Sequence, residues 1–114
     1  MSNRSVDVVA GVLRVDGVAV PTRYPVADAC LSGGNVIVIY APEANPRSWG
    51  TFRNLASVSA DGSELWLADT SETTTGDHFY RIAQAEPLWV YAFRGYDCRI
   101  DPETGRILEK VFTK

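Results

Sequence analysis

Asn35-Val36-Ile37-Val38-Ile39-Tyr40 is a largely apolar run that begins a pattern found twice in this chain. In the first copy the run is followed by the segment 54–59, the turn Ala60-Asp61-Gly62 and the segment 63–68. The corresponding segments of the second copy are 87–92, 96–100, the turn 101–105 and 106–111. Residues 12–20 match the last two strands of a further copy. Repetition with such a period is typical of stacked β-units, so the sequence predicts a repeat-built all-β protein.

Strand patterns dominate the sequence, and the predicted turns between them are short. Asp16-Gly17 supplies two residues that tolerate positive φ, as a tight hairpin between Val15 and Val18 requires. The other predicted turns are Ser32-Gly33-Gly34-Asn35, Asp61-Gly62, Arg94-Gly95 and Asp101-Pro102-Glu103-Thr104-Gly105. In the last of these, the Asp101 side chain is expected to accept backbone N–H groups. Because each turn joins neighbours, the predicted fold class is all-β, an antiparallel meander of about nine strands.

The chain is predicted to form one domain covering residues 1–114. Its 114 residues suffice for one core but not for two. The expected units are a partial repeat at 6–25, a repeat at 26–69 and a repeat at 78–114. Two segments interrupt them: 41–50, with two prolines and a glycine, is predicted to be an inserted loop, and 69–77 a polar joint.

Composition argues against several classes of partner. The net charge is −3, the pI is about 5.0 and the arginines are scattered, so neither nucleic acid nor an anionic membrane is an expected partner. No apolar run approaches the ~20 residues of a membrane-spanning helix. Residues 1–5 lack the apolar core of a secretion signal, which predicts a cytoplasmic location.

The sequence predicts neither a metal site nor a bound cofactor. Cys30 and Cys98 lie far apart in apolar contexts and are expected to be small buried hydrophobes. One histidine and two separate cysteines do not provide the paired spacings of structural zinc. No phosphate-binding glycine loop, GxSxG elbow or HExxH pair is present.

Two strands are predicted to be covered on both faces. Residues 36–40 and 88–93 are apolar at every position, whereas a strand with one wet face alternates polar and apolar residues. One solution folds the sheets over each other as a sandwich or barrel. The other stacks the sheet against a second subunit, so a homo-oligomer is an expected state of this chain.

Each copy consists of an apolar strand, a strand that ends in Asp61-Gly62 or in the turn 101–105, and a third strand that follows the turn. This pattern resembles the blades of PQQ-like, WD40 and related β-propellers. The resemblance extends from about Ala27 to Lys114 and implies architecture only. A closed propeller has at least about four blades, and this chain has material for fewer than three. The alternatives are an open propeller-like sheet, a ring assembled from several chains, or a small β-sandwich or barrel. No residue matches a quinone-binding constellation.

Candidate contact residues are concentrated in the inserted loop. Trp49 lies beside Arg47 between prolines and glycine, and Trp and Arg are enriched at interface hot spots. Arg47, Trp49 and Phe52 are therefore the predicted binding residues, although Trp49 could instead anchor its own loop. Trp66 and Trp89 lie in repeat strands and are expected in the core.

A catalytic alternative rests on the single histidine. Asp77 precedes His78 and could make it a general base, with help from Asp97. The alternative interpretation of His78 is a half-exposed residue at the start of a strand. On a strand, Asp97 would share one face with Arg99, while Cys98 would point to the other face.

Two functions thus remain open from the sequence. The favoured one is a non-catalytic β-repeat module that self-associates or binds a protein or ligand. The alternative is a small enzyme with an acid–base site around His78. A concave pocket around titratable groups would favour the enzyme, and a flat apolar face would favour the module.

Overall fold

The short turns divide the chain into many short strands in three antiparallel sheets. The computed structural model describes residues 4–47, 50–71 and 76–113. The strands of this part are β1 (Val6–Val9), β2 (Val12–Val15), β3 (Val18–Val20), β4 (Val26–Ser32), β5 (Asn35–Tyr40), β6 (Leu55–Val58), β7 (Glu64–Leu67), β8 (Phe79–Gln84), β9 (Trp89–Ala92), β10 (Tyr96–Ile100) and β11 (Ile107–Phe112). A 3-10 helix, η1 (Pro42–Ala44), lies in the inserted loop.

The all-β antiparallel meander is confirmed, but the expected number of strands was too low. The described residues form eleven strands rather than nine. The first hairpin joins two segments rich in β-branched residues: Ala10, at φ 50°, and Gly11, at φ 81°, reverse the chain between β1 and β2. The predicted Asp16-Gly17 turn is present, with φ values of 53° and 79°.

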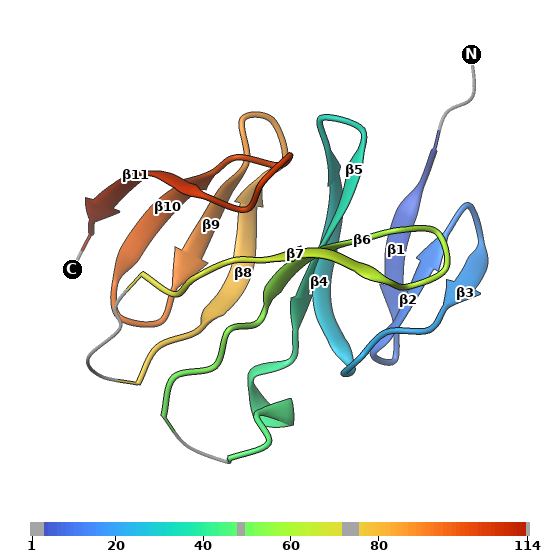
Figure 1. Cartoon of the computed structure of the whole chain (residues 1–114), viewed down its shortest axis with the longest axis horizontal. Coiled ribbons are helices and arrows are strands. Elements are labelled where there is room, and N and C mark those ends of the chain that lie inside the picture. The colour runs from blue at the N-terminus through green and yellow to red at the C-terminus, as the bar shows by residue number, and fades with distance from the viewer. Residues whose placement is uncertain (1–3, 48–49, 72–75, 114) are drawn as a thin grey trace.

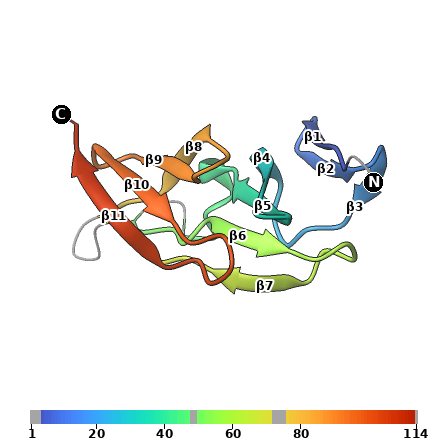
Figure 2. The same ribbon diagram turned by 90° about the horizontal axis from the view of Figure 1, so that it is seen from above.

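Each sheet follows the chain in order. We call β1–β3 the N-terminal sheet, β4–β7 the central sheet and β8–β11 the C-terminal sheet. Their first strands lie next to one another, β1 beside β4 and β4 beside β8. From these first strands the three sheets diverge, so that β7 and β11 lie on the side of the molecule opposite to β1, β4 and β8 (Figures 1 and 2).

The central sheet is covered on both faces, as its apolar β5 predicts. Val36, Val38 and Tyr40 belong to the core cluster shared with the N-terminal sheet. Ile37 and Ile39 belong to the core cluster shared with the C-terminal sheet. Covering β5 therefore requires no second subunit.

Among the residues that the structure describes, the core covers only one face of the second apolar strand. Leu88, Val90 and Ala92 are buried against the central sheet. Trp89 alternates with them and is partly buried on the opposite face, outside the core cluster. The expectation that Trp89 packs in the core was wrong, because the strand alternation turns its side chain outward.

Trp66 does pack against the core, with help from the turn 101–105. Its Nε1 donates to the carbonyl oxygen of Pro102 at 2.9 Å. A Cβ on Gly105, which has a φ of +79°, would lie 2.4 Å from the Trp66 ring, so only glycine fits at this position. Asp101 Oδ1 accepts from the Glu103 backbone N–H at 2.9 Å, as predicted for this turn.

The cysteines have the structural character expected of them. Both are free thiols, with Cys98 buried and Cys30 partly buried. Burial, with smaller contributions from Asp28 and Glu86, raises the pKa of Cys30 to about 11. Burial likewise raises the pKa of Cys98 to about 12. The described part of the chain contains no helix of the length and apolar character needed to cross a membrane.

Candidate functional site

A pocket of about 410 Å³ lies where the inserted loop meets the central sheet. Its volume falls in the range of small-molecule sites, roughly 300–1,000 Å³. The lining residues come from the β3–β4 connection, the end of β5, the loop before β6, and β7: Arg23, Tyr24, Tyr40, Asn45, Pro46, Arg47, Thr51, Phe52, Arg53, Glu64 and Leu67. Two of the three predicted binding residues, Arg47 and Phe52, therefore line the same pocket. Trp49 lies outside the described residues.

Three aromatic rings form the apolar side of the pocket. Tyr40 is the last residue of β5 and follows Val36 and Val38 on the same face of the strand. Tyr24 packs edge-on against Tyr40 and Phe52, with centroid distances of 5.3 and 5.4 Å. Tyr40 and Phe52 are buried, so the rings are held by the core beneath them.

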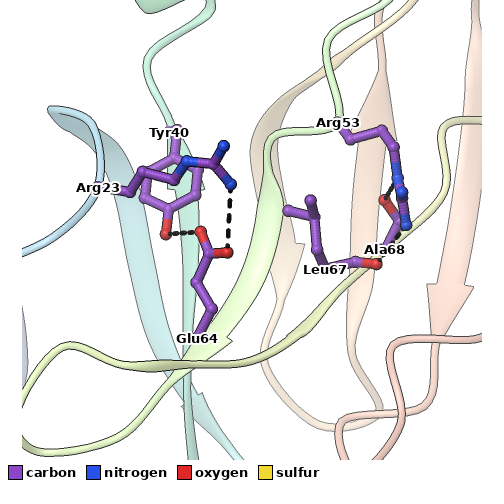
Figure 3. A network of polar contacts seen from close by, with 6 residues as sticks. All are labelled: Arg23, Tyr40, Arg53, Glu64, Leu67 and Ala68. Carbon is purple, nitrogen blue, oxygen red and sulfur yellow. Dashed lines mark hydrogen bonds and ion pairs between the residues drawn. The ribbon is translucent and has the colours of Figure 1, made fainter.

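A polar network joins this aromatic cluster to β7. The Tyr40 hydroxyl donates to Glu64 Oε2 at 2.5 Å, and Arg23 Nη1 lies 3.6 Å from Glu64 Oε1. Figure 3 shows the side chains of Arg23, Tyr40 and Glu64 converging. Burial, and secondarily the hydrogen bond to Glu64, raises the pKa of the Tyr40 phenol well above its ordinary value. Tyr40 is therefore a neutral hydrogen-bond donor at neutral pH.

The other two arginines have different settings. Arg53 donates from Nη2 to the Leu67 carbonyl at 2.8 Å and from Nε to the Ala68 carbonyl at 3.2 Å (Figure 3). These bonds fix its position beside β7. Arg47 is exposed, and its backbone N–H donates to Asn45 Oδ1 at 3.0 Å. Among the described residues, the Arg47 guanidinium has no ion-pair partner.

The pocket is locally positive in a chain of net charge −3. Its described lining carries three guanidinium groups and one carboxylate, that of Glu64. Glu64 is held by Tyr40 and Arg23, and Arg53 Nη2 lies 3.4 Å from Asp69 Oδ1. Among the described residues, Arg47 is therefore the pocket arginine without an ion-pair partner. Guanidinium groups bind carboxylates and phosphates with charge-assisted hydrogen bonds. Together with the aromatic rings, the site suits an anion with an apolar body.

Asp77, His78 and Asp97, the residues of the catalytic alternative, each contact different groups. Asp77 is buried, and its carboxylate accepts from the Ser71 hydroxyl at 2.5 Å and the Arg94 backbone N–H at 3.1 Å. His78 stacks on Phe93 at 4.8 Å. Burial lowers the pKa of His78, opposed by Asp77 and Glu43, so the imidazole is neutral at pH 7.

Asp97 belongs to a surface depression on the C-terminal sheet, lined also by Trp89, Tyr91 and Val111. As predicted, it shares a partly exposed face with Arg99, while Cys98 is buried. In the described part of the chain, no group of three histidine, cysteine or acidic residues could hold a metal ion.

Sequence reasoning missed most of the pocket. Arg23, Tyr24, Arg53 and Glu64 each occur singly among ordinary loop or strand residues. The pairing of β5 with β6 and of β6 with β7 brings Tyr40 and Glu64 together across 24 positions of sequence. A local motif could not have indicated that contact.

A family model described as a domain of unknown function, DUF7957, matches residues 3–112, almost the whole chain. The chain belongs to the DUF7957 family. No curated protein matches this DUF7957 chain, and no solved structure matches it. The family description assigns neither a ligand nor an activity.

Proposed function

We propose that this chain is a non-catalytic binding module whose pocket takes a small organic anion: a flat apolar body that carries a carboxylate or phosphate group. The observation that carries the proposal is the pocket wall, which Arg23, Arg47 and Arg53 line together with three packed aromatic rings. The one carboxylate of the described lining is already paired, so it does not repel an incoming anion as a free carboxylate would.

The contacts within the pocket indicate which residues would bind the apolar body of the ligand and which its anionic group. Tyr24 and Phe52 present apolar area to the body of the ligand. Arg47 meets the anionic group, because its guanidinium is exposed and has no ion-pair partner among the described residues. Arg23 lies over the Tyr24 ring, with Cζ 5.3 Å from the centroid, and orients Glu64.

The experiment is a titration of the ¹⁵N-labelled chain followed by NMR chemical shifts. The probes are phenyl phosphate, benzoate and, as the neutral control, benzyl alcohol. We expect saturable shifts at Tyr24, Phe52 and Arg53 with one or both anions and much weaker binding of the alcohol. Comparing the two anions decides between phosphate and carboxylate as the preferred group.

Variants test the role of the guanidinium. Arg47→Ala should weaken binding about tenfold, because a charge-assisted hydrogen bond is worth roughly 1.5–3 kcal/mol. Arg81→Ala, on β8, is the matched control because Arg81 is an exposed arginine that does not line the pocket. Equal binding of the alcohol and both anions, or equal losses in the two variants, would contradict the proposal.

A further inference from the structure

The C-terminal sheet has one face on which no other sheet packs within the described part of the chain. Strand register places Tyr91 beside Arg81 and Asp97, and Trp89 beside Gln84 and Arg99. On β11, Val111 pairs with Asp97 on this face. Tyr80 is 48% exposed and stacks on Tyr91 with a centroid distance of 6.0 Å. We call this the outer face of the C-terminal sheet.

The equivalent face of the central sheet is covered. β5 and β9 are each the second strand of a four-stranded meander. Val36, Val38 and Tyr40 face the preceding sheet, as Leu88, Val90 and Ala92 do in the second meander. Ile37 and Ile39 face the C-terminal sheet, which follows the central sheet in the chain. Trp89 and Tyr91 hold the corresponding positions on β9, but no described sheet follows the C-terminal sheet. The outer face of the C-terminal sheet therefore corresponds to the face of the central sheet on which the C-terminal sheet packs.

The opposite end of the molecule has a complementary open face. On the N-terminal sheet, Leu13 and Val15 point into the core, so Val12 and Arg14 point outward. Register places Val9 beside Val12, and Asp7 beside Arg14. Val9 and Val12 are almost half exposed, and Arg14 Nε lies 3.7 Å from Asp7 Oδ1. We call this the outer face of the N-terminal sheet.

The geometry points to a second copy of this chain as the occupant of both faces. The outer face of the C-terminal sheet of each copy packs on the outer face of the N-terminal sheet of the other. This contact repeats the sheet-on-sheet packing that already joins the three sheets within one chain. It places β8 of one copy next to β1 of the other, as β4 lies next to β1 within the chain.

The shape of the chain supports a closed ring made of two copies. Three sheets per chain give six per pair, within the range of about four to eight blades that close into a ring. The Cα extents are 41 × 29 × 21 Å, so the shortest is about half the longest, as in half of a disc. Figure 2 shows the first strands β1, β4 and β8 along one side, where the centre of the disc would lie.

The charges on the two faces are balanced by ion pairs. Asp7 pairs with Arg14 on one face, and Arg99 Nε lies 3.3 Å from Glu109 Oε1 on the other. The two faces therefore meet without net repulsion. A ring of two copies also leaves no open face, whereas an unclosed head-to-tail contact would produce filaments.

The experiment measures solution mass by size exclusion with light scattering over a dilution series. A monomer has 12.5 kDa, and the proposal expects a concentration-dependent species of twice that mass. Tyr80→Glu on one face and Val12→Glu on the other should each lower the dimer affinity at least about tenfold by burying an unpaired charge. Leu65→Glu on β7, 59% exposed and on neither face, is the control that should leave the mass unchanged.

A mixing experiment separates the head-to-tail arrangement from its alternatives. Tyr80→Glu retains an intact N-terminal face, and Val12→Glu retains an intact C-terminal face. An equimolar mixture should therefore recover dimers through one intact contact, at concentrations where each variant alone is mostly monomeric. Far-UV circular dichroism of each variant shows that the lost association is not lost folding.

Three results would overturn the proposal. One is a wild-type chain that stays monomeric at the highest concentrations. Another is a dimer that Tyr80→Glu abolishes and Val12→Glu does not affect, which would mean that two C-terminal sheets pack on each other. The third is a mixture of the two variants that stays monomeric.

Discussion

Tyr40 connects the core of this molecule to the candidate pocket. It ends the most apolar strand of the chain, and its buried ring packs against Tyr24. Its hydroxyl reaches Glu64 on β7 at 2.5 Å, at the edge of the pocket. One side chain thus contributes both to the stability of the central sheet and to the orientation of the Glu64 carboxylate.

Because of the Tyr40 phenol, the free energy of unfolding should decrease with rising pH in the alkaline range. The folded state raises the pKa of Tyr40, whereas the unfolded chain titrates at the ordinary value of 10.0. The proton is therefore bound more tightly in the folded state, and the stabilisation is complete below pH 10 and lost as the pH rises above it. Tyr40→Phe should be less stable by about 1–2 kcal/mol at neutral pH. The gap to the wild type should narrow above pH 10.

Urea unfolding of both proteins at neutral pH and above pH 10 measures this gap. The two proteins differ only in the Tyr40 hydroxyl, so the difference between them reports on that group. A gap that stays constant across pH 10 would mean that the Tyr40 hydroxyl does not titrate differently in the folded state.

At the scale of the elements, Asn54 links the central and C-terminal sheets. This buried side chain precedes β6, and its Nδ2 donates to the carbonyls of Tyr40 and Phe79 at 2.9 and 2.7 Å. Its Oδ1 accepts from the Phe79 backbone N–H at 2.9 Å. Asn54 thereby satisfies backbone groups at the end of β5 and the start of β8 and joins the two strands.

Removing this link should be costly. Asn54→Ala leaves several backbone groups buried without a partner, so the free energy of unfolding should fall by about 2–4 kcal/mol. Asn35→Ala is the matched control, because Asn35 is half-buried and its side chain donates to exposed groups of Gly33 and Glu103. That variant should lose less than about 1 kcal/mol. Similar losses in urea unfolding would show that the Asn54 bridge has no special role.

The elements differ in how far the sequence could predict them. The Asp16-Gly17 hairpin, the turn 101–105 and the double coverage of β5 follow from local residue types, and the structure confirms them. The pocket could not be predicted in full, because Arg23 and Glu64 meet only through strand pairing across the central sheet. The exposed face of β9 could not be distinguished from a covered one, since an all-apolar strand does not tell which sheet, or which chain, packs on it.

On the scale of the whole molecule, the three sheets are unequally protected. β5 lies between β4 and β6 within its sheet and between two core clusters across it. β11 is an edge strand that pairs only with β10, and its side chains beyond Ile107 are exposed. Local opening should therefore release β11 without unfolding the centre of the molecule.

Native-state hydrogen exchange tests this order directly. The amides of Ile37, Val38 and Ile39 should exchange only through global unfolding, with a free energy equal to that from urea titration. Amides of β11 should exchange at least about tenfold faster. The measurement belongs at the lowest protein concentrations, where a dimer would dissociate and the single chain is observed. Equal protection of β5 and β11 in the single chain would mean that the C-terminal sheet unfolds only together with the central sheet, as one cooperative unit.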